Sequence, residues 1–461
     1  MSGKKTVTAI AAVVALGAVG AVAGTGYYVH SELSQLEVAP AYAMPEAADV
    51  LVPATPETIN RDQLTATLQA LADDPALGTF HARVSDAFTG EVLFDASSDQ
   101  PLTPASSTKV LTTAAALYTL DPADRITTQV VRGTNEGDVV IKAAGDVWLT
   151  EDTVAQLAEQ IGQANAVFVD TRAWSGQQEM MPEWDPGNVD AGYVAPLQPV
   201  MINAGRIGAT EGDVPRSHTP ALDVAQAVAG KVGATTVGYS EAAEGAEVIA
   251  EVHSPELIER LRVMMKNSDN VMAEAIGREV AAARVGEKAT VLNAPQHTLD
   301  VLGEHGYDLT GVTLADNSGL STLNNIAPAL IDDILLRSAD LASADLASSV
   351  GGEGDDLATS VGGEGDDLAT SGADAGGALA LLLTTLPVAG GEGTLTTRYG
   401  DLQGKGWVRA KTGTLTGVNA LAGTVTSDKG NVYTFAFLSN GVEIDPARRA
   451  MDTMASALRD F

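Results

Sequence analysis

A serine and a lysine three residues apart stand at the head of an alanine- and leucine-rich stretch, TPASSTKVLTTAAAL, at residues 103–117. A lysine in the first turn of a helix opposes the helix dipole, so Lys109 carries a cost that suggests a function. Residues three apart on a helix are neighbours, which pairs Ser106 with Lys109 and points Ser107 away. Because a neutral amine can take the proton of an adjacent hydroxyl, the pattern predicts a nucleophilic serine with a lysine base.

Two further segments support this prediction, since Ser-x-x-Lys alone also fits an ordinary surface lysine. The segment NSDN supplies Ser268 and Asn270 at a break between two helical patterns, where a loop can expose both side chains. A predicted edge strand, AKTGTLTG, supplies four more candidates: Lys411, Thr412, Gly413 and Thr414. In such a strand Gly413 permits close approach of a substrate backbone, and the strand offers an amide for an oxyanion hole. The three segments in this order are not expected by chance.

Hydrophobic periodicity predicts the elements that would hold these residues. Two alternating strands joined at 88–90 form a predicted hairpin within 78–97. Near the C-terminus, GWVRAKTGTLTG, NALAGTVTS and VYTFAFLSN are three consecutive predicted strands. A helix follows. We expect Asp445 to cap its N-terminus and Pro446 to lie in its first turn. Its apolar stripe predicts packing on an antiparallel sheet and consists of Ala447, Met451, Met454, Leu458 and Phe461.

The N-terminal segment indicates where the chain works. Lys4 and Lys5 precede an uncharged apolar stretch from Val7 to about Val29, which is long enough to span a hydrocarbon core of ~30 Å. The two lysines favour an inside N-terminus. A cleaved signal peptide is the alternative, although its small-residue site, AYA at 41–43, lies far beyond the apolar stretch. We therefore favour a retained transmembrane anchor, and both alternatives place the rest of the chain outside the cytoplasm, in the cell envelope.

Composition excludes several classes of function. The 461 residues include no cysteine, which excludes a disulfide scaffold and thiolate metal sites. A formal net charge of −33 argues against nucleic acid and anionic membrane surfaces as partners. No His-x-x-x-His helix is present, so we expect neither a metal nor a cofactor. A Ser-His-Asp hydrolase is disfavoured because GYSEA around Ser240 lacks the final glycine of a nucleophile elbow.

One low-complexity segment differs from the rest of the chain. SVGGEGDDLAT at 349–359 recurs without change at 360–370. Calcium-binding nonapeptide repeats are one interpretation, but the period here is eleven and the apolar residue is displaced. The other interpretation is a flexible acidic loop, over 340–376, created by duplication.

The combined segments resemble those of penicillin-interacting serine peptidases. The finer resemblance is to D-alanyl-D-alanine carboxypeptidase/endopeptidases of the class C, PBP4-like group, peptidase family S13. It covers roughly 75–461 and rests on the Ser-x-x-Lys segment, GYVAPLQPVMINAGR, DNSGLS, LPVAGGEGTL and VRAKTGTLTGVNALAG. The resemblance implies an α/β (α+β) fold of the serine DD-peptidase/β-lactamase type, in which helices flank an antiparallel sheet and a smaller α/β domain is inserted.

The resemblance also implies an organisation along the chain. The middle stretch, where short strands such as TTQVVRG alternate with helices such as TVAQLAEQIG, would be the inserted domain. The expected parts are a membrane anchor or signal segment at 1–30, a linker at 31–58, a peptidase domain at 59–126 and 253–461, and an inserted domain at 127–252.

By the same resemblance, Ser106 would be the acylated nucleophile and Lys109 its base. Ser268 would relay the proton toward the leaving amine, and Asn270 would hold the amide of the substrate. The backbone N–H groups of Ser106 and Thr414 would form the oxyanion hole.

The lysine and the threonines of the edge strand would bind the substrate carboxylate. Lys411 would supply positive charge near it, while Thr412 and Thr414 donate hydrogen bonds. Repulsion between Lys411 and Lys109 would favour a neutral Lys109. One departure from the family pattern is Asn317, in DNSGLS, where glycine is common.

The implied function is serine-type D-Ala-D-Ala carboxypeptidase or endopeptidase action on peptidoglycan stem peptides, with β-lactam antibiotics as covalent inhibitors. One alternative is a β-lactamase of the same fold, which would need a fast deacylation that no sequence feature guarantees. The other is a non-catalytic peptidoglycan-binding scaffold, which would have no need of Ser106 and Lys109.

Overall fold

The computed structural model describes Thr25 and residues 58–174, 178–350 and 375–461. The N-terminal apolar segment, nearly all of the linker and most of the duplicated repeat lie outside the described residues. Among the helices that are described, none is both long and apolar enough to cross a membrane.

A five-stranded antiparallel sheet, in the order β10-β11-β12-β1-β2, forms the first layer of the fold. Its strands are β1 (Thr79–Asp86), β2 (Val92–Ala96), β10 (Val408–Leu415), β11 (Val418–Thr426) and β12 (Val432–Asn440). The predicted hairpin and the three predicted C-terminal strands are confirmed. Because β1 pairs with β12, the sheet brings together segments that are far apart in the sequence. Strand β10 lies at the edge of the sheet, as predicted.

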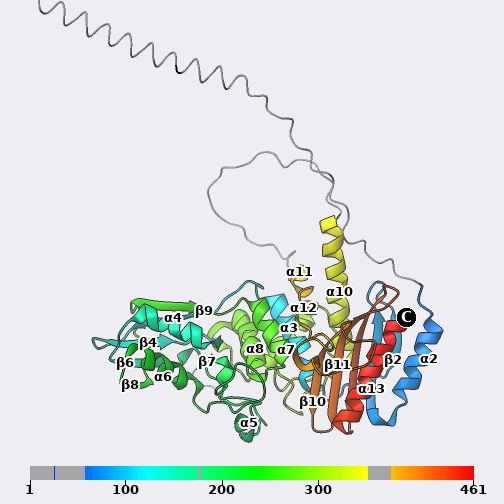
Figure 1. The fold of residues 1–461 in the computed structure, drawn as a ribbon, viewed down its shortest axis with the longest axis horizontal. Coiled ribbons are helices and arrows are strands. Elements are labelled where there is room, and N and C mark those ends of the chain that lie inside the picture. Colours follow the sequence, from blue (N-terminus) through cyan, green and yellow to red (C-terminus); the bar gives the residue numbers. More distant parts are fainter. Residues whose placement is uncertain (1–24, 26–57, 175–177, 351–374) are drawn as a thin grey trace, which may run out of the picture. The chain divides into compact units, whose positions relative to one another are not determined.

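Helices cover both faces of this sheet (Figure 1). The bulky residues Phe435 and Phe437 pack in one hydrophobic core with α2 (Arg61–Ala72) and α13 (Ile444–Ala457). The alternate residues Ala436 and Leu438 face a second core. This alternation is what the period of two in a strand dictates. Several helices contribute to the second core, among them α3 (Lys109–Thr119), α8 (Asn270–Val285) and α10 (Pro328–Val350).

The C-terminal helix packs on the sheet as predicted, but its predicted start is wrong. Met451, Met454 and Leu458 are fully buried in the core beneath it. The helix begins at Ile444, and Glu443 occupies the N-cap without a side-chain hydrogen bond to the helix. Asp445 therefore lies in the first turn rather than at the cap, where its charge still complements the helix dipole.

A second five-stranded sheet has the order β8-β6-β4-β3-β9 and is mixed. Its strands are β3 (Thr127–Arg132), β4 (Asp138–Lys142), β6 (Ala166–Asp170), β8 (Thr236–Tyr239) and β9 (Val248–His253). Pairs β4–β6 and β6–β8 are parallel, and β3 is antiparallel to both of its neighbours. Helices α4 (Glu151–Ile161) and α6 (Pro220–Val232) share a hydrophobic core with this sheet.

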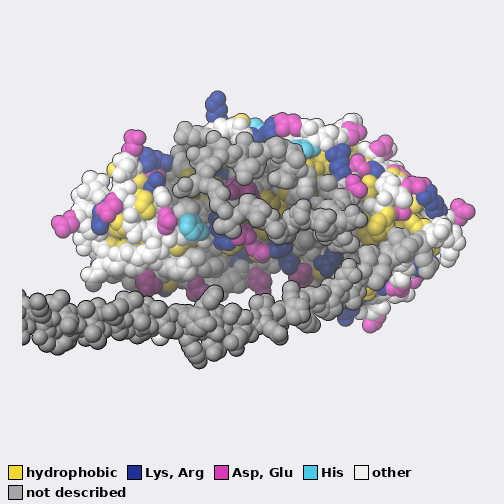
Figure 2. All heavy atoms as spheres, turned by 90° about the horizontal axis from the view of Figure 1, so that it is seen from above, with side chains coloured by type: hydrophobic (Ala, Val, Ile, Leu, Met, Phe, Trp, Pro, Cys, Tyr) yellow, Lys and Arg dark blue, Asp and Glu magenta, His cyan; other side chains and the backbone are white. Residues whose placement is uncertain are grey.

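The remaining elements connect these layers. Two short parallel strands pair with each other, β5 (Asp146–Leu149) and β7 (Val200–Ile202). The other described helices are α5 (Gly187–Asp190), α7 (Leu257–Asn267), α9 (Ala294–Glu304), α11 (Ala375–Leu379) and α12 (Leu382–Thr385). On the face drawn in Figure 2, acidic side chains are scattered among basic ones rather than gathered in one region.

Candidate active site

The predicted serine–lysine pair lies where the chain enters α3. Ser106 is in a 3₁₀ turn, Ala105–Thr108, and the α-helix begins at Lys109. Lys109 Nζ lies 3.1 Å from Ser106 Oγ, within hydrogen-bond distance. Ser107 is buried and donates to the carbonyl of Pro104, so it points away from the lysine. The spacing of three therefore brings Ser106 and Lys109 together although the turn is tighter than an α-helix.

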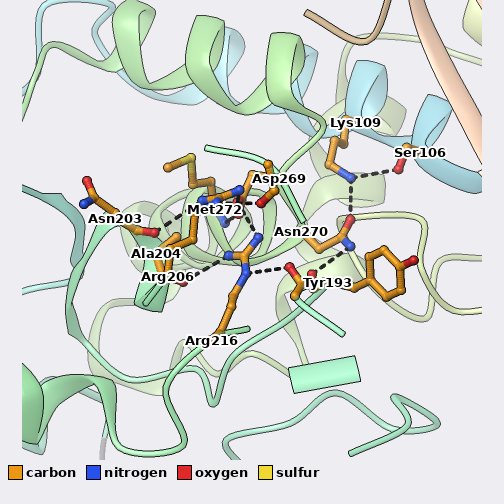
Figure 3. Close-up of polar contacts among 12 residues, drawn as sticks. Ser106, Lys109, Tyr193, Asn203, Ala204, Arg206, Arg216, Asp269, Asn270 and Met272 are labelled. Atoms are coloured by element: carbon orange, nitrogen blue, oxygen red, sulfur yellow. Dashed lines mark hydrogen bonds and ion pairs between the residues drawn. The ribbon is translucent and has the colours of Figure 1, made fainter. Parts of the chain in front are cut away.

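Lys109 is enclosed and has two acceptors besides the serine. Its Nζ donates to Asn270 Oδ1 at 2.8 Å and to the carbonyl of Ser318 at 2.6 Å. Figure 3 shows Ser106, Lys109 and Asn270 converging from two helices. The lysine side chain is fully buried. Three polar partners in an enclosed position fix the amine next to the hydroxyl.

Burial lowers the pKa of Lys109 from 10.5 to about 8. Loss of water around the ammonium is the largest cause, and the charge of Arg216 acts in the same direction. Asp316, Asp269 and Glu274 oppose this shift because their negative charges favour the ammonium. Lys109 therefore gives up its proton more readily than an ordinary lysine, and burial rather than repulsion between cations is the main reason.

The segment NSDN forms the junction between α7 and α8. Ser268 ends α7 in the left-handed conformation, with φ of 57°. Asp269 caps α8 by accepting from Met272 N at 2.8 Å. Asn270 is the first residue of α8 and is only 8% exposed, so the expectation that a loop exposes both side chains is wrong for it. Its Nδ2 donates to the carbonyl of Tyr193 at 3.1 Å.

The edge strand β10 brings Lys411 to the same place. Lys411 Nζ donates to Ser268 Oγ at 2.8 Å and to the carbonyl of Thr412 at 2.7 Å. The side chain is fully buried. Burial lowers the pKa of Lys411 well below its usual range, with smaller contributions from the charges of Lys109 and Arg398. The structure thus places Lys411 Nζ beside Ser268 Oγ, in a buried environment where a charged ammonium is unfavourable.

Gly413 lies against the turn that carries the serine. A Cβ added at Gly413 would be 2.7 Å from the carbonyl oxygen of Pro104 and 3.1 Å from Ala105 Cβ. On another segment, a Cβ at Gly319 would be only 1.9 Å from the carbonyl oxygen of Ala105. Gly413 therefore lets the strand approach the chain itself beside Ser106, where there is no room for a side chain. Close approach of a substrate backbone at Gly413 stays a prediction.

The chain is similar to known proteins over most of its length. A family model described as the D-Ala-D-Ala carboxypeptidase 3 (S13) family matches residues 64–229, 213–349 and 373–461. The chain belongs to this family. It is accordingly a hydrolase of the D-Ala-D-Ala carboxypeptidase class.

Relatives of this S13 peptidase match it over most of its length. Carboxypeptidase DacB of Mycolicibacterium smegmatis is 36% identical over 96% of this chain and 94% of its own. A carboxypeptidase of Mycobacterium tuberculosis is 38% identical over 90% of this chain and 87% of its own. The crystal structure of penicillin binding protein 4 from Haemophilus influenzae superposes with a TM-score of 0.65 at 19% identity, covering 88% of this chain and all of that one (100%). This last likeness shows a shared serine DD-peptidase-like fold.

The S13 site also contains a buried ion-pair cluster that sequence reasoning missed. Asp269 Oδ2 accepts from Arg206 at 2.7 Å and from Arg216 at 2.8 Å (Figure 3). All three side chains are almost fully enclosed. Arg216 also donates to the carbonyl of Ala204 at 3.0 Å. The cluster therefore ties the junction between α7 and α8 to the segment that follows β7.

A second missed group, Glu274, positions the carbonyl that binds Lys109. Glu274 on α8 accepts from the backbone N–H groups of Asn317 and Ser318, each at 2.9 Å. Burial, with the nearby charge of Asp316, raises the pKa of Glu274 to about 8. Asn317 itself packs against Gly277, where an added Cβ would lie 2.3 Å from its Nδ2. Asn317 stands where glycine is common in the family pattern. Its larger side chain fits because the residue that faces it on α8, Gly277, has no side chain.

Within the described ranges, no cluster of three or more His, Asp or Glu side chains is placed to hold a metal ion.

Proposed function

We propose that Ser106 is the acylated nucleophile of a serine-type D-Ala-D-Ala carboxypeptidase/DD-endopeptidase that acts on peptidoglycan stem peptides, with β-lactams as covalent inhibitors. The observation that carries this proposal is the environment of Lys109. A neutral amine has two N–H bonds and one lone pair. Since Asn270 Oδ1 and the Ser318 carbonyl can accept both N–H bonds, the lone pair remains for the proton of Ser106.

Acylation would then proceed as follows. Ser106 Oγ attacks the carbonyl carbon of the penultimate D-Ala while Lys109 takes the hydroxyl proton. The backbone N–H groups of Ser106 and Thr414 stabilise the oxyanion. Ser268 Oγ delivers a proton to the leaving amine, and its hydrogen bond with Lys411 Nζ supports this relay. Water later hydrolyses the ester, which releases the shortened peptide and restores Ser106.

For Asn270 we propose two tasks. Its Oδ1 holds Lys109, and its Nδ2 would turn from the Tyr193 carbonyl to a carbonyl of the bound peptide. Thr412 and Thr414 on β10 would bind the substrate carboxylate. The hydroxyl of Thr412 is within 2.8 Å of Thr394 Oγ1, which fixes its orientation.

The experiment is incubation with benzylpenicillin, followed by intact mass measurement and peptide mapping. We expect a lasting adduct on Ser106 and D-Ala release from diacetyl-L-Lys-D-Ala-D-Ala. Ser106→Ala should show neither, whereas the matched control Ser107→Ala should retain both, because that hydroxyl donates to the Pro104 carbonyl. Rapid loss of penicillin with little adduct would identify a β-lactamase, and no adduct with no turnover would contradict the proposal.

We also propose that residues 127–252 form a domain inserted into a peptidase domain made of 59–126 and 253–461. The support is that all five strands of the second sheet lie between Thr127 and His253.

For the N-terminal segment we propose a retained membrane anchor at 1–30, with the peptidase in the cell envelope. The uncharged stretch after Lys4 and Lys5 supports this. N-terminal peptide mapping of the protein from envelope fractions should recover peptides from the first 30 residues. A mature chain that starts at Met44, after AYA, would show instead that a signal peptide is cleaved.

A further inference from the structure

Two arginines at the carboxylate end of the proposed site differ in the length of their ion pairs. Arg398 is paired with Asp452 through two hydrogen bonds, of 2.6 and 3.0 Å. Arg448, on α13, has a weaker ion pair, since Asp445 Oδ1 is 3.8 Å away and the Asp445 side chain is 77% exposed. An exposed ion pair of that length contributes little. Among the described residues, Arg448 therefore has no short ion pair with a buried carboxylate, although the charge of Asp452, which is paired with Arg398, also acts on it.

Arg448 is aimed at the strand that would bind the substrate carboxylate. Its terminal nitrogen donates to Thr414 Oγ1 at 2.8 Å. Since that hydroxyl accepts from the guanidinium, its own proton remains available to an incoming group. The Arg448 side chain is 38% exposed, so the charge is accessible from solvent. Lys411, in contrast, is fully buried and donates to Ser268 and to the Thr412 carbonyl.

We infer that Arg448 is the cation that selects substrates with a free carboxylate α to the leaving nitrogen, and that Lys411 serves Ser268 instead. This inference rests on the proposed function. It differs from the sequence-based expectation in that Arg448, rather than Lys411, supplies the positive charge near the substrate carboxylate. An arginine next to a threonine hydroxyl offers a carboxylate two donors and a permanent charge. A terminal D-Ala presents such a carboxylate, and so does a cross-linked diamino diacid whose side-chain amine stands on a carbon that bears a carboxyl group.

The test compares diacetyl-L-Lys-D-Ala-D-Ala with the same peptide ending in a carboxamide. We expect Arg448→Gln to lower the ratio of kcat/KM for the acid over the amide by about 10- to 100-fold, the range for loss of a hydrogen bond to a charged group. Arg448→Lys should recover part of the ratio because it keeps the charge. Because both substrates are measured on the same preparation, a loss of folded protein cancels in the ratio.

Arg449→Gln is the matched control, since it removes the same charge from the same helix at an exposed position next to Arg448. An unchanged ratio in Arg448→Gln, or an equal loss on both peptides, would overturn the inference and leave Arg448 a structural residue. Failure of the proposed function looks different: the wild-type chain would then hydrolyse neither peptide and form no penicillin adduct, and the inference would fall with it.

Discussion

Lys109→Met is expected to slow acylation of Ser106 by about 10²- to 10⁴-fold, the contribution of a positioned general base. Methionine is unbranched and fills most of the space of the buried side chain, but it has no amine to take the serine proton. The measurement is the rate of benzylpenicillin adduct formation by mass spectrometry. The wild-type rate should rise with pH and level off above about 8, because the lysine acts as a base only when neutral. The variant should lack this rise.

The control for this substitution is Lys231→Met, which removes an exposed lysine from the last turn of α6. Its acylation rate and pH profile should match those of the wild type. Near-UV circular dichroism establishes that each variant is folded before rates are compared. A Lys109→Met protein that is folded and acylates at the wild-type rate would rule out Lys109 as the base.

Asp269→Asn is expected to lower the free energy of unfolding by about 3–5 kcal/mol, the cost of breaking a buried ion pair from one side. Burial alone would raise the pKa of Asp269, but the charges of Arg216 and Arg206 and their hydrogen bonds lower it below its usual range. Because the folded-state pKa is lowered, this contribution is complete above the unfolded value, near 4, and is lost progressively as pH falls below that value into strong acid. Denaturant unfolding at pH 7 measures the loss.

Asp213→Asn, at an exposed position three residues before Arg216 in the sequence, is the matched control for this prediction. It should change the free energy of unfolding by less than about 0.5 kcal/mol. If Asp269→Asn costs no more than this control, the ion-pair cluster does not hold the junction between α7 and α8. Acylation by Asp269→Asn should also slow, since Ser268 and Asn270 flank the substituted residue.

Local patterns are enough to predict the five strands of the first sheet and the pairing of Ser106 with Lys109. A spacing of three brings side chains together in both an α-helix and a 3₁₀ turn, so the prediction did not depend on which one forms. Period-two alternation likewise predicted β12, whose odd and even residues enter different cores. The cap at Asp445 was mistaken because helix ends vary by one or two residues, and residue preference alone does not fix them.

The long-range polar network could not be predicted from the chain. Arg206 and Arg216 reach Asp269 from 63 and 53 residues away, and an arginine looks the same in sequence whether exposed or enclosed. The carbonyl of Pro104, which lies against Gly413, comes about 300 residues earlier in the chain, so this contact is known only from the fold. The contact of Lys411 with Ser268 spans 143 residues, so local patterns do not predict it either.

Because β1 pairs with β12, the first sheet of the enzyme cannot form in full until nearly the whole chain has been synthesised. Ser439 Oγ donates to the Leu77 carbonyl across 362 residues of sequence, so the central sheet has no partner for its first hairpin until the last strand is present. Ser106 and Lys109 are synthesised early, whereas Lys411 and Gly413 come from the last fifth of the chain. Contacts so distant in sequence form slowly and late. A nascent or truncated chain therefore carries the nucleophile without the strand that completes its site.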